Sequence, residues 1–389
     1  MRDQTLLVIG AGIGGLCLAL GLQRAGFKVI VCEAAPHLGE VGAGLTISPN
    51  ATHALEFLGL GPVLAEIGDR PDSGAGLHYK TGEVLYSTQS NGSFREQFDA
   101  EYYQTHRADL HDALAAAVRA NDPEAVRVDH TFTAVEQTSA GVVAMFSNGT
   151  TIAAAALIGA DGIRSGVRAA LFGQETPKFT GQVAFRGIVA ADPVRHCMTP
   201  TPSAVFIGPG HIFTRYYMRH RTLVNYVGIA RTQAWREEGW STPATIEELL
   251  HEYGGWHEHV QAIIHATPKG RLFKWGLFDR DPLPKWTVGR VTLLGDAAHP
   301  MLPFLGMGAA MAIEDAVVLA RCLAASAAFD EAFARYEAAR GERTKMVLLN
   351  SRAQGVIYQA DDPMRLKMAN APGEIRLGLF NYNPATVAV

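Results

Sequence analysis

Cysteine is scarce in this sequence of 389 residues, and no two cysteines form a C-x-x-C pair. The four cysteines, Cys17, Cys32, Cys197 and Cys322, lie far apart along the chain. Such spacing argues against a zinc cluster, a dithiol redox centre and a secreted disulfide framework. We therefore expect no bound metal.

Long hydrophobic runs and a strong charge of one sign are also missing. No stretch of about 18 uninterrupted apolar residues occurs, so no transmembrane helix is predicted. The net charge of −4 provides no field that would attract nucleic acid or an anionic membrane. With 48% hydrophobic and 19% charged residues, the composition is that of a folded globular protein. We expect a cytoplasmic protein, whose oligomeric state the composition leaves open.

The N-terminus carries a nucleotide-binding pattern. An apolar run at 6–9 predicts a buried strand, and residues 16–25 and 28–32 predict a helix and a second strand. Between the first strand and the helix, Gly10, Gly12 and Gly15 occupy the glycine positions of G-x-G-x-x-G, with Gly14 beside them. These glycines permit a tight turn, close approach of a pyrophosphate and close packing of the helix on the strand. Glu33, next to Ala34, follows the second strand, where a carboxylate can accept ribose hydroxyls.

A second site far along the chain separates FAD from NAD. Residues 290–294 predict a buried strand that ends in Gly295-Asp296, and a helix is predicted from about Gly308 to Ala325. Asp296 suits the hydroxyls of a ribityl chain, which NAD lacks. A helix that begins at Gly308 and Ala309 would direct its positive end toward a flavin ring and stabilise the reduced, anionic form. Together the two sites predict non-covalent FAD.

The expected fold class is α/β, with a Rossmann-type FAD-binding domain, a second and mostly antiparallel β-sheet substrate domain, and C-terminal helices. The FAD-binding domain is expected to be discontinuous, over residues 1–75, 100–180 and 280–350. Residues 76–99 and 181–279 are assigned to the substrate domain, and 351–389 to a C-terminal tail without assigned structure. Strands at 126–128, 134–137, 142–146 and 150–154 are expected to form an antiparallel meander. A last long helix is expected at 330–351.

These motifs resemble those of the class A flavoprotein aromatic hydroxylases, the p-hydroxybenzoate hydroxylase-like family. The resemblance covers about residues 5 to 350 and is nearest to the salicylate, 3-hydroxybenzoate and 6-hydroxynicotinate hydroxylases. The segments that carry it are Gly10–Gly15 with Glu33, Gly159–Ser165 with Arg168, Gly295–Pro300, and more weakly His106–Leu110. It implies that Asp161 takes part in FAD and nicotinamide binding, that Arg107 reaches the flavin and that Asp296 holds the ribityl chain.

The implied activity is hydroxylation of a small aromatic compound, hydroxylated and carboxylate-bearing, with NADH or NADPH and O2. Reduced flavin and oxygen give a C4a-hydroperoxide, which transfers oxygen to an electron-rich ring. No second dinucleotide fingerprint occurs, so NAD(P)H is expected to bind only transiently. Two alternatives stay open: a flavin hydroxylase or epoxidase of a larger non-phenolic substrate, and a flavin-binding redox sensor without turnover.

Some positions depart from the family pattern or lie outside its motifs. Met307 stands where many relatives have glutamine, and Thr46 and Phe304 stand where 6-hydroxynicotinate enzymes carry histidines, which disfavours that substrate. Within the expected substrate domain, His211, Arg215 and Tyr217 alternate so that they share one face of a strand. We expect this face to line the substrate pocket and to provide the catalytic residues, a base and a substrate anchor, with Arg215 binding a carboxylate through its planar fork.

Overall fold

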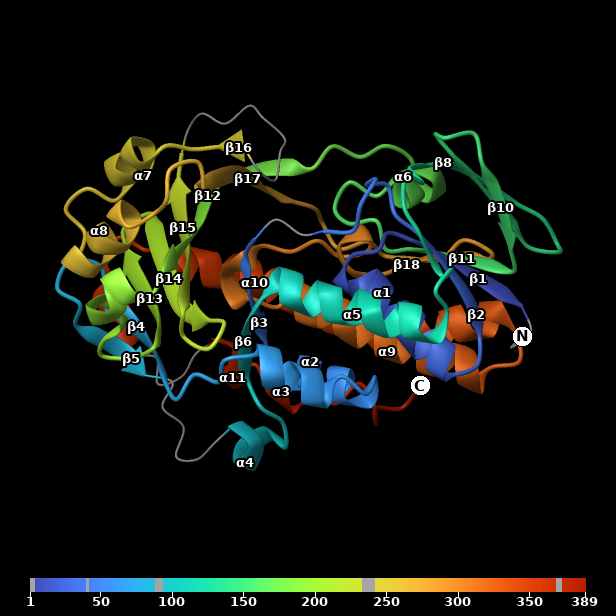
Figure 1. Cartoon of the computed structure of the whole chain (residues 1–389), viewed down its shortest axis with the longest axis horizontal. Helices are drawn as coiled ribbons and strands as arrows, with labels where there is room; N and C mark the ends of the chain where they lie inside the picture. Colours follow the sequence, from blue (N-terminus) through green and yellow to red (C-terminus); the bar gives the residue numbers. More distant parts are fainter. Residues whose placement is uncertain (1–3, 40–41, 88–93, 233–241, 369–372) are drawn as a thin grey trace.

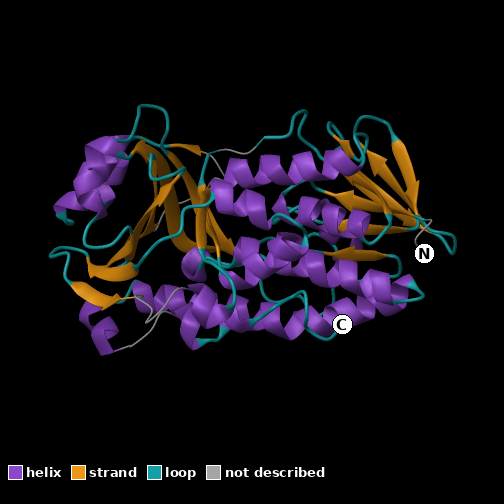
Figure 2. Cartoon of the chain, turned by 60° about the horizontal axis from the view of Figure 1, so that its bottom comes forward, coloured by secondary structure: helices purple, strands orange, loops and turns teal. Residues whose placement is uncertain are grey.

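Figure 1 shows the protein as a computed structural model. The structure describes residues 4–39, 42–87, 94–232, 242–368 and 373–389. Strands gather in two groups at opposite ends of the molecule, and long helices run between them (Figure 2). The α/β class and the Rossmann-type arrangement predicted from the sequence are confirmed.

One end of the molecule is a five-stranded parallel sheet with the strand order β18-β11-β1-β2-β7. Its strands are β1 (Thr5–Ile9), β2 (Lys28–Cys32), β7 (Val126–Arg127), β11 (Ala156–Gly159) and β18 (Val291–Leu293). The apolar run at 6–9 forms the central strand, because a parallel strand covered by helices is apolar on both faces. Its first three residues, Leu6, Leu7 and Val8, are inaccessible to solvent.

Four helices pack beside this sheet or along one another (Figure 1). They are α1 (Ile13–Arg24), α5 (Arg107–Asn121), α9 (Gly308–Ala325) and α10 (Phe329–Tyr358). Helix α9 has the predicted bounds, whereas α10 continues past the predicted end at Ser351 to Tyr358. Its last turn is held by tertiary packing, since Tyr358 is buried against the second sheet. None of the helices in the described ranges is long and apolar enough to cross a membrane.

The other end is an eight-stranded sheet with the order β16-β17-β12-β15-β14-β13-β4-β5, antiparallel except between β13 and β4. Its strands are β4 (Gly74–His78), β5 (Val84–Ser87), β12 (Lys178–Ala190), β13 (Ser203–Gly208), β14 (His211–Met218), β15 (Leu223–Arg231), β16 (Thr242–Pro243) and β17 (Phe273–Asp279). One face packs on α7 (Ile246–Glu252), α8 (Glu258–His265) and the 3-10 turn η1 (Asp192–Met198). The other face turns toward α10 and the centre of the molecule.

The remaining elements are two small sheets and several short helices and turns. A three-stranded antiparallel sheet contains β8 (Phe132–Gln137), β9 (Val142–Phe146) and β10 (Thr151–Ala154), and a two-stranded sheet contains β3 (Gly44–Ile47) and β6 (Tyr103–His106). The short helices are α2 (Pro49–Phe57), α3 (Gly61–Ile67), α4 (Phe94–Phe98), α6 (Gly166–Phe172), α11 (Gly373–Arg376) and the turns η2 (Gly295–Ala297), η3 (Pro303–Leu305), η4 (Pro363–Met368) and η5 (Leu379–Asn381). The prediction that 126–128 belongs to the meander is wrong: β7 pairs in parallel with β2. A strand of two residues has no periodicity that could reveal its partner.

Candidate active site

A cavity of about 560 Å³ lies between the carboxyl edge of the parallel sheet and the inner face of the eight-stranded sheet. From the parallel sheet it is lined by the turns after β1, β11 and β18. From the other sheet it is lined by side chains of β4, β13, β14 and β15. The carboxyl edge of a parallel sheet is where open α/β folds bind ligands, so this is the candidate site.

The glycines of the first turn divide into two groups. A Cβ at Gly10 would lie 2.4 Å from the carbonyl oxygen of Ala160, and a Cβ at Gly15 would lie 2.0 Å from that of Gly10. These two glycines therefore allow backbone segments to approach one another. A Cβ at Gly12 would meet nothing within 4 Å, and Gly12 and Gly14 line the cavity. The backbone at Gly12 is thus open to a ligand.

Asp296 faces the same cavity from the turn after β18. Burial raises the pKa of its carboxyl group, while His299 and Arg107 act in the opposite direction. Arg107, Gly308 and Ala309 also line the cavity. Because α9 begins at Gly308, its unpaired N–H groups and positive dipole end lie at the cavity wall.

A buried ionic network fixes the turn that carries Asp296. The Gly295 N–H donates to Asp315 Oδ2 over 3.0 Å, and His299 Nε2 lies 2.5 Å from the same oxygen. Arg340 Nε donates to the other oxygen of Asp315 over 2.7 Å. Burial by itself would raise the pKa of Asp315, but His299 and Arg340 lower it to about 2. This carboxylate therefore stays ionised and holds the turn in place.

The remaining predicted cofactor residues do not line the cavity. Glu33 accepts hydrogen bonds from the N–H groups of Ala11 (2.8 Å) and Ala35 (3.0 Å), and Ala34 is exposed beside it. Asp161 does not line the cavity, and its carboxylate accepts from Ser165 Oγ at 2.5 Å and from the Val167 N–H at 3.1 Å. In this structure Asp161 therefore stabilises the start of α6, and its neighbour Gly162 lines the cavity instead.

The expectation that His211, Arg215 and Tyr217 line the substrate pocket is wrong in this structure. The three do share a face of β14, but that face packs on α7, α8 and η1. Arg215 is fully buried and donates to the carbonyl oxygens of Thr201 (2.8 Å) and Thr199 (2.9 Å). His211 lies 3.1 Å from Glu252 on α7, and Tyr217 belongs to the apolar core. Arg215 thus holds a loop and is not the carboxylate anchor.

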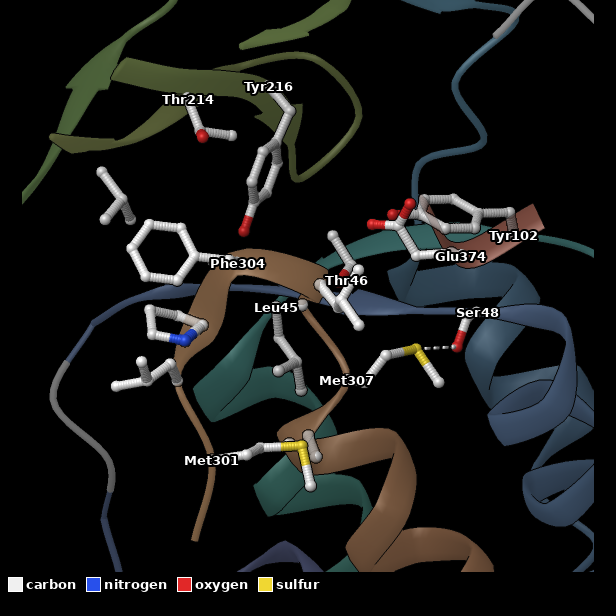
Figure 3. A pocket seen from close by; sticks show the side chains of 18 of the residues that line it. Leu45, Thr46, Ser48, Tyr102, Thr214, Tyr216, Met301, Phe304, Met307 and Glu374 are labelled. Carbon is white, nitrogen blue, oxygen red and sulfur yellow. Dashed lines mark hydrogen bonds between the residues drawn. The ribbon is translucent and has the colours of Figure 1, made fainter. Parts of the chain in front are cut away.

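The opposite face of β14 lines the pocket, through Ile212, Thr214 and Tyr216. Figure 3 shows the Tyr216 hydroxyl directed into the pocket above Phe304, with Thr46 across from it. Thr46 and Phe304 therefore line the pocket, as the family resemblance implied. Met307 also lines the pocket, and its sulfur lies 3.8 Å from the Ser48 hydroxyl.

The C-terminal tail closes this half of the pocket, which the sequence did not indicate. Tyr358 at the end of α10, Glu374 on α11 and Phe380 on η5 all line it. The hydroxyls of Tyr358 and Tyr86 lie 2.9 Å apart. Short 3-10 and helical turns carry no hydrophobic period, so only the tertiary structure places these residues.

The fold and the cavity define a dinucleotide-binding protein of the Rossmann type. Residues 3–351 match the family model described as FAD binding domain. The chain is 38% identical over 359 residues to 3-hydroxybenzoate 6-hydroxylase 1 of Aquipseudomonas alcaligenes, covering 92% of this chain and 90% of the relative. It is 37% identical over 367 residues to 6-hydroxynicotinate 3-monooxygenase of Pseudomonas fluorescens, covering 93% and 94%. Among solved structures, it resembles Klebsiella pneumoniae HpxO complexed with FAD and uric acid, with a TM-score of 0.84, 25% identity and coverage of 97% and 93%.

The chain belongs to the FAD binding domain family. It is an FAD-dependent aromatic monooxygenase, as the family resemblance of its motifs predicted.

Proposed function

We propose that this enzyme hydroxylates a small aromatic ring that carries a hydroxyl and a carboxylate, using NADH or NADPH and O2. The observation that carries this proposal is one continuous cavity of about 560 Å³, which joins the nucleotide turn to a half lined by aromatic rings and hydroxyl groups. A flat ring bound there would lie beside the flavin. Because NAD(P)H is a cytoplasmic reductant, we place the enzyme in the cytoplasm.

The residues of the cavity fit FAD. We propose that the open backbone at Gly12 and Gly14 receives the pyrophosphate, that Asp296 accepts the ribityl hydroxyls and that Gly308 and Ala309 present the positive end of α9 to the ring. Arg107 would contact the flavin from α5. Glu33, next to Ala34, would contact the adenosine ribose. Gly10 and Gly15 would support the turn, and Asp161 would support the segment beside it. FAD supplies the electrons taken from NAD(P)H and activates oxygen.

The two halves of the cavity would have separate roles. Backbone N–H groups and Asp296 would position the cofactor, whereas Thr214 and Tyr216 on β14 and Phe304 on η3 would enclose the ring. The apolar side chains around them exclude water, which favours oxygen transfer to the ring over release of peroxide. A ring held in one orientation presents one carbon to the reacting oxygen.

Replacing Asp296 by Ala is expected to weaken FAD binding about 10- to 150-fold, because a hydrogen bond to a charged group contributes about 1.5–3 kcal/mol. Fluorescence titration of the apoprotein with FAD measures this change. Asp192→Ala is the control, since Asp192 is 88% exposed and should leave FAD binding unchanged. Equal FAD affinity of Asp296→Ala and the parent would show that the ribityl chain lies elsewhere.

Separate assays with salicylate, 3-hydroxybenzoate and 6-hydroxynicotinate are expected to show which of these candidates is a substrate. At least one hydroxybenzoate should stimulate NADH or NADPH oxidation and yield a product heavier by one oxygen atom in mass spectrometry. We expect less from 6-hydroxynicotinate because Thr46 and Phe304 cannot provide the ionisable contacts of histidine. Stimulated oxidation without any oxygenated product from these rings would favour a larger non-phenolic substrate.

A further inference from the structure

Glu374 is the one acidic side chain that the described pocket lining presents on the substrate side. It lies on α11, in the tail, and the sequence offered no reason to select it. Figure 3 shows its carboxylate beside the ring of Tyr102, across the pocket from Thr214 and Tyr216. The side chain is half-buried, and it lines the cavity. A carboxylate held there can meet a ring substituent bound between these walls.

A proton acceptor accelerates hydroxylation of a phenol, because the ring becomes far more reactive toward an electrophilic oxygen as its hydroxyl loses the proton. The described lining of the pocket contains no histidine. Its tyrosines do not serve, since burial raises the pKa of Tyr86, Tyr102, Tyr216 and Tyr358 above the usual value. Asp296 lies at the turn after β18, on the cofactor side. Glu374 remains as the acceptor.

We propose that Glu374 is the catalytic base that removes the proton from the ring hydroxyl of the substrate. In this step the phenolic O–H bond breaks and an O–H bond forms on a carboxyl oxygen of Glu374. The electron pair left on the phenolic oxygen is delocalised into the ring, and the step involves no oxidation or reduction. The proposal depends on the proposed function, because it requires a hydroxylated aromatic substrate.

The surroundings of Glu374 set its affinity for the proton. Burial raises the pKa of its carboxyl group to about 7, and Arg376 on the same helix acts in the opposite direction. Among the described residues, the titratable groups that interact with it from other elements are Tyr86 on β5, Tyr102 before β6 and Tyr358 on α10. A base with a pKa near the working pH is the most effective one. Since a raised pKa keeps the acid protonated at lower pH, catalysis should fall as the pH drops below about 7.

Glu374→Gln tests the proposal in the FAD-loaded enzyme, with whichever of salicylate, 3-hydroxybenzoate and 6-hydroxynicotinate the parent converts fastest. Glutamine has the shape of glutamate but accepts no proton at neutral pH. Product formation should fall about 10²- to 10⁴-fold, while the ring still stimulates NAD(P)H oxidation and the electrons appear as hydrogen peroxide. The acid limb of kcat/KM near pH 7 should disappear. Asp361→Asn makes the same carboxylate-to-amide change on an exposed residue of the tail and should match the parent.

Two measurements keep the result unambiguous. FAD content and circular dichroism show whether Glu374→Gln folds, and Glu374→Asp, which retains a carboxylate, should recover part of the product and the acid limb. If the parent makes product and Glu374→Gln makes it at the same rate and with the same pH profile, the base lies elsewhere and the proposed function stands. If the parent oxygenates none of the three rings, the proposed function fails, and the assignment of Glu374 fails with it.

Discussion

Arg340→Met is expected to lower the free energy of unfolding by about 3–5 kcal/mol, the usual cost of breaking a buried ion pair from one side. Arg340, Glu314 and Asp315 are all inaccessible to solvent. The guanidinium group lies 2.5 Å from Glu314 and 2.7 Å from Asp315. Methionine fills much of the space but leaves the two carboxylates with less compensating charge. Arg343, 2.8 Å from Glu314, neutralises only part of the negative charge of these two carboxylates.

Urea unfolding of the apoprotein, followed by circular dichroism, measures this change. Lys345→Met on the same helix is the matched control, because Lys345 is half exposed and pairs only loosely with Glu342 at 3.5 Å. Exposed pairs contribute at most about 1 kcal/mol, so the control should stay near the parent. A loss below about 1 kcal/mol in Arg340→Met would mean that the network relaxes or that its acids take up protons. Because Asp315 also holds Gly295 and His299, we expect FAD affinity to fall in the same variant.

Gly15→Ala is the second change with a large expected effect. The added Cβ would lie 2.0 Å from the carbonyl oxygen of Gly10, where no side-chain rotation can relieve the clash. The turn and α1 must move apart, and because backbone atoms collide we expect a cost at the upper end of the usual range for overpacking, about 3 kcal/mol. Since the displaced turn includes Gly12, FAD binding should fall by about 100-fold or more, at 1.4 kcal/mol per factor of ten.

FAD content after purification and thermal unfolding of the apoprotein measure both consequences. Gly341→Ala provides a control with the same chemical change, because a Cβ at this position of α10 would meet nothing within 4 Å. There alanine should stabilise the helix by up to about 1 kcal/mol. A Gly15→Ala protein that retains FAD like the parent would contradict the close packing of helix and strand at this turn.

Local requirements of the chain made the cofactor half of the site predictable. Gly10 and Gly15 are dictated by a turn in which backbone atoms approach one another, and Gly12 leaves its backbone open to a ligand. Asp296 could be selected because it ends an apolar strand and precedes the helix that begins at Gly308. Each of these motifs is a short pattern of neighbouring residues, so the sequence by itself determined the Rossmann-type fold and the choice of FAD as cofactor.

The substrate half depended on contacts between distant segments. Alternation along β14 correctly separated Arg215 from Tyr216 but could not say which face meets the pocket. That choice is made by α7 and α8, which lie later in the chain and cover the face of Arg215. Likewise Glu374 reaches the pocket only because the tail folds back over the end of α10. The sequence determined the two faces of the strand and the cofactor. The tertiary structure decided which face and which acidic side chain line the pocket, because apolar burial selects the face that helices cover.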